Sequence, residues 1–204
     1  MVEHNSDSRR TQAQRSESTR AALLDAARGL FSEQGYARSG QEAIVAAAGV
    51  TRGALQHHFG TKQSLFIAVY EEVEQEVMAS VAQAAMTVDS DHPLEMLRSG
   101  CQAYLDAVLN PSVQRICAVD GPAVVPTDIR QAITDRYALG LVRETVQMAV
   151  EIGELRDTPI EPLSRMLLAA VIAAAEYVAT APSPEAARAE AGDTVDLLLA
   201  SLQR

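Results

Sequence analysis

The fold of this chain is decided by residues 41–62, QEAIVAAAGVTRGALQHHFGTK. A helix-forming run with apolar residues on one face ends at Gly49, where glycine accepts the left-handed backbone of a helix end. Thr51 can then cap a second helix with its hydroxyl, and Leu55 and Phe59 should turn inward together. Two short helices joined by a tight turn, with a polar face on the second, predict a helix-turn-helix unit that can enter the major groove of DNA.

The outward face of the predicted second helix carries the candidate base-reading residue, Arg52. Its guanidinium can bind O6 and N7 of guanine together; a phosphate contact or a surface ion pair is the alternative. Gly53 leaves room for close approach of the backbone. Ser39 is expected to cap the helix that begins at residue 41, and the free amides at the start of that helix would suit a phosphate oxygen. Contacts with phosphates position a protein without reading sequence, and the residues expected to make them are Ser39, Thr51, Gln56, His57 and Lys62.

An ordered set of positions in this region resembles the tetracycline-repressor (TetR) family of bacterial regulators. One departure is Gln56, because the family usually has a tyrosine there, often on a DNA phosphate; glutamine could still reach a phosphate or the edge of an adenine. The resemblance implies a homodimer with a small-molecule pocket in a helical C-terminal body, and repression as the commoner mode. The likeness reaches back to residue 18, and its carriers are Ile44, the run AAGV at 47–50, Arg52, Gly53, Leu55, His58, Phe59, Gly60 and Lys62.

The distribution of charge is compatible with DNA binding although the net charge is −10. Residues 1–62 hold eight basic and six acidic groups, and the remainder holds nine basic and 21 acidic groups. Screening makes phosphate attraction local, so the acidic remainder would be kept off the duplex and would help to orient the basic end toward it. A charge of +2 is ordinary for a domain, so the helix pattern carries more of the argument than the charge does.

The chain as a whole predicts an all-α fold; 48% of its 204 residues are hydrophobic and none is tryptophan. Residues 1–17 are polar and predict a disordered N-terminal arm, residues 18–63 the helix-turn-helix DNA-binding domain, and residues 64–204 a helical ligand-binding and dimerisation domain. Cys101 and Cys117 give no disulfide framework, which favours a reduced cytoplasmic setting. No signal peptide is expected, and the apolar run 166–175 is too short to cross a bilayer.

The last two predicted helices, 163–181 and 184–203, have more apolar surface than one small body needs to cover. An exposed stripe of this kind usually indicates a partner. We therefore expect a homodimer with a four-helix interface and two-fold symmetry, which would match a pseudo-palindromic operator. The residues expected to form the interface are Leu167, Val171, Ala174, Val195, Leu198 and Leu202.

The resemblance also implies an apolar effector pocket in the C-terminal body. Each candidate residue is more often part of an ordinary helical core, and the identity of the effector is not encoded in any motif. Glu176, a carboxylate in an apolar run, is expected to face water or to pair with a basic group. The candidates, which come from helices that should converge, are Cys101, Tyr104, Cys117, Tyr137, Leu141, Met166 and Ala170.

Other classes of protein find little support in the sequence. It lacks the GxSxG, P-loop, dinucleotide-binding, HExxH and CxxC motifs that carry common enzyme chemistry, so we expect neither an enzyme nor a cofactor. His57 and His58 diverge by about 100° around a helix and cannot converge on one metal ion. A transcriptional activator of the same fold, or an architectural DNA-binding protein without an effector, remains the alternative to a repressor.

Overall fold

The computed structural model describes residues 4–89 and 91–203, and the chain divides into two compact units, Met1–Tyr70 and Glu71–Arg204. Within the described residues the regular structure is helical, apart from an isolated antiparallel bridge between Leu155 and Gln203. The prediction of an all-α fold is therefore confirmed.

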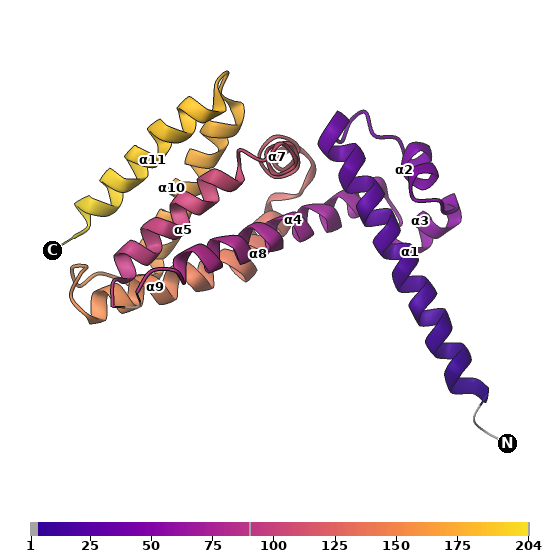
Figure 1. Cartoon of the computed structure of the whole chain (residues 1–204), viewed down its shortest axis with the longest axis horizontal. Helices are drawn as coiled ribbons and strands as arrows, with labels where there is room; N and C mark the ends of the chain where they lie inside the picture. The colour runs from indigo at the N-terminus through magenta and orange to yellow at the C-terminus, as the bar shows by residue number, and fades with distance from the viewer. Residues whose placement is uncertain (1–3, 90, 204) are drawn as a thin grey trace. The chain divides into compact units, whose positions relative to one another are not determined.

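The first unit is built on helix α1, against which two short helices pack (Figure 1). Its core contains side chains that are fully or almost fully buried, among them Leu23, Phe31, Ile44 and Leu55. The ring of Phe31 lies edge-on to that of Phe66, with centroids 5.1 Å apart. The helices of this unit are α1 (His4–Gln34), α2 (Gln41–Ala47), α3 (Arg52–His58) and the beginning of α4 (Lys62–Ala85).

The boundary between the units falls later than the predicted break after residue 63. The first two turns of α4 belong to the first unit because Leu65, Phe66 and Val69 are completely buried. Phe66 also packs against Tyr36, with ring centroids 5.1 Å apart. The hydrophobic spacing of this helix is continuous, so it could not indicate where one core ends and the next begins.

The beginning of α1 also differs from the sequence-based expectation. Residues 1–17 were expected to form a disordered arm with a helix starting at residue 18, whereas α1 begins at His4. Residues 4–17 contain neither proline nor glycine, so nothing in that segment breaks a helix that continues from the packed part of α1. Residues 1–3 lie outside the described residues.

The turns on either side of α3 follow the predicted chemistry. Gly49 and Gly60 have φ angles of 65° and 71°, in the left-handed region that other residues rarely enter. Thr51 Oγ1 accepts a hydrogen bond of 3.2 Å from the amide of Ala54, which caps α3 as predicted. These turns fix the direction of α3, and therefore determine which of its side chains face solvent.

The second unit is a helical body around one hydrophobic core. Side chains of α5, α9, α10 and α11 fill the core, including Leu105, Val146, Leu167, Val178 and Leu199. The segment 120–126 is largely helical, with Pro122 in the first turn of α7, where a missing N–H costs nothing. Beyond the rest of α4, the elements are α5 (Pro93–Ala107), α6 (Pro111–Val113), the π-helix η1 (Gln114–Asp120), α7 (Gly121–Val124), α8 (Thr127–Thr134), the π-helix η2 (Asp135–Leu139), α9 (Gly140–Glu151), α10 (Ile160–Thr180) and α11 (Pro184–Ser201).

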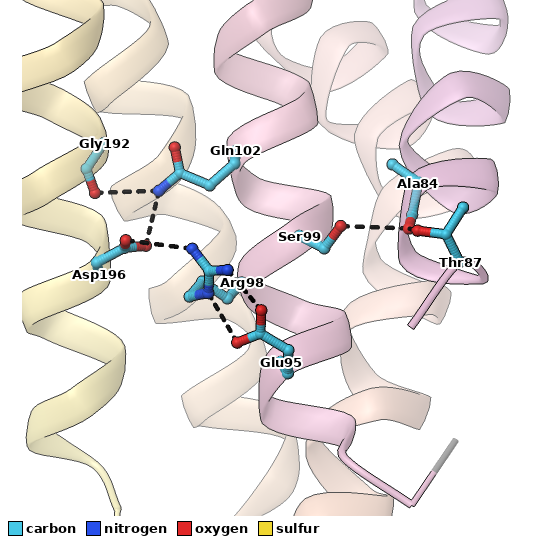
Figure 2. Close-up of polar contacts among 8 residues, drawn as sticks. All are labelled: Ala84, Thr87, Glu95, Arg98, Ser99, Gln102, Gly192 and Asp196. Carbon is cyan, nitrogen blue, oxygen red and sulfur yellow. Dashed lines mark hydrogen bonds and ion pairs between the residues drawn. The ribbon is translucent and has the colours of Figure 1, made fainter. Parts of the chain in front are cut away.

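Helix α5 is tied by polar side chains to neighbours on two sides (Figure 2). Toward α4, Ser99 Oγ donates to the carbonyl oxygen of Ala84 at 3.2 Å. Toward α11, Gln102 Nε2 donates to Asp196 Oδ1 at 2.6 Å and to the carbonyl oxygen of Gly192 at 3.1 Å. Arg98 bridges Glu95 of its own helix and Asp196.

Arg188 of α11 extends this polar contact to α5. Its Nε donates to Asp106 Oδ1 at 2.6 Å and its Nη1 to Gln102 Oε1 at 2.7 Å. The Arg188 side chain is 20% exposed, so water can replace these bonds only in part.

Replacing Arg188 with alanine is expected to lower the free energy of unfolding by about 2 kcal/mol, because hydrogen bonds to a charged partner are lost together. Urea denaturation at a fixed protein concentration measures this change. Arg143→Ala, at an exposed position of α9, is the matched control and should stay within about 0.5 kcal/mol of the parent protein. Equal effects of the two substitutions would show that the contact between α5 and α11 adds no stability.

Candidate DNA-binding surface

Helix α3 presents the face that the sequence predicted. Leu55 is 1% exposed and points into the core of the first unit, whereas Arg52, Gly53, Gln56 and His57 are exposed. The predicted inward face is confirmed at Leu55, and Phe59, predicted to turn inward with it, is partly buried at the end of α3. The polar residues lie on the outward face as predicted.

The inner side of this surface is held in place by α1 and α2. Ile44 and Val45 of α2 are buried, and the guanidinium carbon of Arg20 on α1 lies 5.4 Å from the centroid of the Phe59 ring, at the end of α3. Such a cation–π contact adds a modest stabilisation to the packing of the apolar side chains. The exposed face of α3 therefore rests on a fixed support within the unit.

The side chain of Thr51 caps α3 and can still donate a hydrogen bond to DNA. Its Oγ1 accepts the amide of Ala54, so the hydroxyl proton remains free to be donated. The residue is exposed at the start of α3. A phosphate oxygen could therefore accept from the same hydroxyl that caps the helix.

The predicted role of Ser39 is wrong. Its side chain is completely buried, and its hydroxyl lies within hydrogen-bond distance of the carbonyl oxygens of Gly35, at 2.8 Å, and Leu30, at 3.1 Å. Gly40 is the N-cap of α2, and no side chain caps that helix. The Ser39 side chain therefore bonds to the last turns of α1 and to the residue that follows that helix. Its hydroxyl is therefore not available to a phosphate.

Lys62 makes a structural contact as well as being a candidate for DNA binding. Its Nζ donates to the carbonyl oxygen of Tyr36 at 2.9 Å and lies 4.1 Å from the centroid of the Tyr36 ring. The ammonium group ties the start of α4 to the loop after α1. Two of its three N–H groups remain for other acceptors, and the phosphate contact remains a prediction.

Arg52, the candidate base-reading residue, forms an ion pair that the sequence did not predict specifically. Its Nη1 donates to Glu42 Oε1 at 2.9 Å, and the two side chains are 71% and 75% exposed. Glu42 belongs to the first turn of α2. The two residues lie ten positions apart across the turn, a separation for which no helical or strand periodicity predicts contact.

Gly53 leaves the surface of α3 open next to Arg52. A methyl group built at Gly53 would meet only Thr51 Oγ1, at 3.7 Å, which is an ordinary van der Waals contact. Alanine therefore fits the free protein, and helix propensity predicts a gain of about 0.5–1 kcal/mol in the free energy of unfolding.

The substitution Gly53→Ala is expected to weaken operator binding about tenfold, which corresponds to about 1.4 kcal/mol, because the methyl group would occupy space needed for close approach to DNA. Thermal unfolding and gel-shift titration measure the two opposite effects. Gly29→Ala, on an exposed and open position of α1, should give the same gain in stability with no change in binding. A Gly53→Ala protein that binds DNA like the Gly29→Ala protein would show that α3 does not approach DNA at this point.

The predicted pocket residues do not all gather at one site. Leu141 is 40% exposed and Met166 is 70% exposed, so neither lies inside the second unit with the other candidates. Cys101 belongs to the core of the second unit, and Tyr104 packs against that core. Tyr137 is half-buried and donates to Glu71 Oε1 at 3.1 Å, and Cys117 is also partly buried.

Burial raises the pKa values of two candidate pocket residues, Cys101 and Tyr104. It raises the pKa of the Cys101 thiol to about 12, so this residue stays protonated and unreactive at neutral pH. Burial also raises the pKa of Tyr104 well above the ordinary value of a tyrosine, with further contributions from Glu74, Cys117 and Glu176. Tyr104 is therefore a neutral hydroxyl, suited to hydrogen bonding.

The predicted dimer interface requires a similar correction. Leu167, Val171 and Val195 are 5%, 7% and 4% exposed and lie in the core of their own unit. Leu167 and Val171 therefore offer little surface to a partner, whereas Val195, although mostly buried, also lines a hollow on the surface of α10 and α11. Of the other predicted residues, Leu198 is 38% exposed, and Ala174 and Leu202 are partly buried. Helix α10 is apolar nearly all round, so its sequence could not indicate which side faces outward.

A surface hollow of about 360 Å³ marks the outer side of α10 and α11. The hydroxyl of Tyr177 donates to Glu190 Oε2 at 2.8 Å within this hollow. Tyr177, which lines the hollow, is 52% exposed, and on the same two helices Met166 and Leu197 are 70% and 72% exposed. The hollow is lined by Ala170, Ala174, Tyr177, Glu190, Ala191, Thr194, Val195 and Leu198.

The arrangement of α1, α2 and α3 defines the first unit as a helix-turn-helix DNA-binding domain, and comparisons with known proteins agree. Residues 23–69 match the family described as bacterial regulatory proteins, tetR family, and residues 94–202 match the tetracyclin repressor-like C-terminal domain. The chain belongs to the TetR family of transcriptional regulators.

Individual relatives support the same assignment. The HTH-type transcriptional regulator CymR of Pseudomonas putida is 33% identical over 132 residues, which span 63% of this chain and 64% of CymR. The crystal structure of a TetR-family transcriptional regulator from Pectobacterium atrosepticum has a TM-score of 0.82 at 31% identity, covering 93% of this chain and 96% of that one. SmeT, the repressor of the Stenotrophomonas maltophilia multidrug efflux pump SmeDEF, has a TM-score of 0.72 at 26% identity, covering 91% and 90%.

By length and composition alone, α10 could cross a membrane. It differs from a lipid-facing helix in that it packs against α5, α9 and α11, with Leu167, Val171 and Val178 buried among them. A core helix of a folded body meets the same criteria of length and composition. One face of α10 is thus buried in the core, and the other is exposed, with Met166 and Tyr177 70% and 52% exposed.

Proposed function

We propose that the protein is a homodimeric repressor that a small, largely apolar ligand releases from a palindromic operator. The observation that carries the proposal is the outward face of α3, where Arg52, Gly53, Gln56 and His57 lie exposed on a buried support. Arg52 would read guanine, and Thr51, Gln56, His57 and Lys62 would contact phosphates.

The outer side of α10 and α11 supports dimerisation. Met166, Ala170, Ala174 and Tyr177 follow one another at the spacing of a single helix face, and all of them are exposed or partly buried. Leu197 and Leu198 of α11 are exposed on the neighbouring helix. A contiguous apolar surface of this kind is typical of an interaction site, and a second copy satisfies it with two-fold symmetry.

A dimer would present two copies of α3 to one duplex. Half-sites about one helical turn apart, about 34 Å, would match the pair. Each protomer would add its own phosphate contacts, so binding should weaken steeply with salt. The acidic second unit, which contributes nothing to phosphate attraction, would orient the basic unit toward the DNA.

The effector would bind within the second unit. Five of the predicted pocket residues are buried or partly buried there: Cys101, Tyr104, Cys117, Tyr137 and Ala170. Ala170 lines the surface hollow, and the other four combine apolar surface with hydroxyl and thiol groups. SmeT also has a structure in complex with triclosan, at 25% identity to this chain. In the proposed mechanism the ligand binds more tightly to the conformation that does not fit both half-sites, and it thereby shifts the population.

The proposal places the protein in the cytoplasm with its DNA, and Cys101 and Cys117, which form no disulfide, agree with a reducing compartment. A transcriptional activator of the same fold is the second candidate. An architectural protein would need neither a palindrome nor an effector.

The test begins by selecting duplexes from a random-sequence library with the purified protein. A palindromic consensus, a discrete gel shift that contains two chains per duplex, and a steep loss of affinity with salt are expected. A selection without a consensus, giving only smeared complexes, would contradict the regulator and favour the architectural protein. A reporter gene behind the selected duplex then separates repression from activation.

A further inference from the structure

We propose that Glu42 determines specificity by positioning Arg52 for base reading, an inference that rests on the proposed DNA-binding function. The observation is the contact of 2.9 Å between Glu42 Oε1 and Arg52 Nη1. It joins the first turn of α2 to the first residue of α3, and it lies on the exposed side of the helix-turn-helix domain.

Stability does not account for this pair. Both side chains are more than two thirds exposed, and exposed ion pairs contribute about 0–1 kcal/mol. A carboxylate on this surface also has a cost, because it repels the phosphates that supply most of the non-specific affinity for DNA. Its benefit must therefore lie in what it does to Arg52.

The geometry lets Arg52 keep Glu42 and bind a base at the same time. A guanidinium has five N–H groups, and in this structure only Nη1 contacts Glu42. Two of the remaining N–H groups are enough for O6 and N7 of guanine. With one edge held by Glu42, a flexible side chain loses less conformational freedom when it binds, and it is kept from folding back onto a phosphate.

Glu42 acts through Arg52, and it increases the difference between the affinity for the preferred duplex and the affinity for any other sequence. On the preferred duplex, the held guanidinium meets a guanine and offsets the repulsion by the carboxylate. On any other sequence the repulsion remains without that compensation. Removing Glu42 should therefore strengthen non-specific binding and weaken the preference for the selected sequence.

The experiment compares dissociation constants for the duplex selected by the parent protein and for a scrambled duplex of equal composition, at one salt concentration. Glu42→Ala should tighten binding to the scrambled duplex about threefold or more and lower the ratio of the two constants about tenfold. Glu42→Gln, which keeps an acceptor oxygen without the charge, should retain part of the ratio. Glu33→Gln, at an exposed carboxylate on α1, removes the same charge and should leave the ratio unchanged.

The double substitution Arg52→Ala with Glu42→Ala separates positioning from general repulsion. If Glu42 works through Arg52, its removal should not change the ratio further once Arg52 is absent. The proposal would be overturned if removing Glu42 lowered the ratio of the two dissociation constants equally in the parent protein and in Arg52→Ala. It would also be overturned if the Glu42→Ala protein behaved like Glu33→Gln. In either case the proposed function would still stand if Arg52→Ala alone lost the preference. A parent protein that does not distinguish the two duplexes would overturn both.

Discussion

Replacing Arg52 with alanine is expected to weaken binding to the selected duplex by roughly 100-fold or more. A bidentate contact with guanine contributes about 1–3 kcal/mol of discrimination, and a dimer would lose one in each half-site. The scrambled duplex should be affected much less, because most of its affinity comes from phosphate contacts. Gel-shift titration with both duplexes measures the two effects.

Arg143→Ala is the matched control, because it removes the same charge from an exposed position in the second unit. It should bind both duplexes as the parent protein does. The side chain of Arg52 is 71% exposed, so its loss should leave the fold intact, which circular dichroism can verify. An Arg52→Ala protein with unchanged preference would show that α3 does not read bases through this residue.

Replacing Leu198 with glutamate is expected to produce monomers. Leu198 is 38% exposed on the outer side of α11 and lines the surface hollow, so the folded chain can accommodate the charge. In a dimer the same carboxylate would be buried without a partner, which costs several kcal/mol per ion. The dimer dissociation constant should therefore rise by at least about 100-fold, and sedimentation should detect the change. Specific DNA binding should be lost with the dimer.

Leu141→Glu tests whether the location of the charge matters. Leu141 is 40% exposed on α9, close to the exposure of Leu198, and it lies outside the hollow. This protein should remain a dimer and keep its preference for the selected duplex. A dimer that persists in Leu198→Glu, or dissociates equally in both proteins, would place the interface elsewhere.

The helix-turn-helix domain could be predicted from the sequence because its signals are local. Gly49, Thr51 and Gly60 fix the turns through backbone and capping preferences, and the spacing of Leu55 and Phe59 fixes which face turns inward. Each of these signals acts within a few residues and does not depend on distant packing. The orientation of α3 followed from them.

Features that depend on packing between helices could not be predicted in the same way. The outer side of α10 was misassigned because leucine, valine and alanine surround the helix, and only its neighbours show that Leu167 and Val171 face inward. Ser39 resembles a helix cap in sequence, but it is buried against the carbonyl oxygens of Leu30 in α1 and of Gly35 just after that helix. The contact between Glu42 and Arg52 exists only once α2 and α3 have packed.

The central claim is that the outward face of α3 contacts DNA, and site-specific photo-crosslinking tests it most directly. A photoreactive amino acid would replace Gln56 on α3 or, in a control protein, the exposed Gln147 on α9. Both proteins would be irradiated with the selected duplex. Crosslinks to DNA from position 56 and none from position 147 are the predicted result; a duplex that crosslinks to position 147 and not to position 56 would contradict the account.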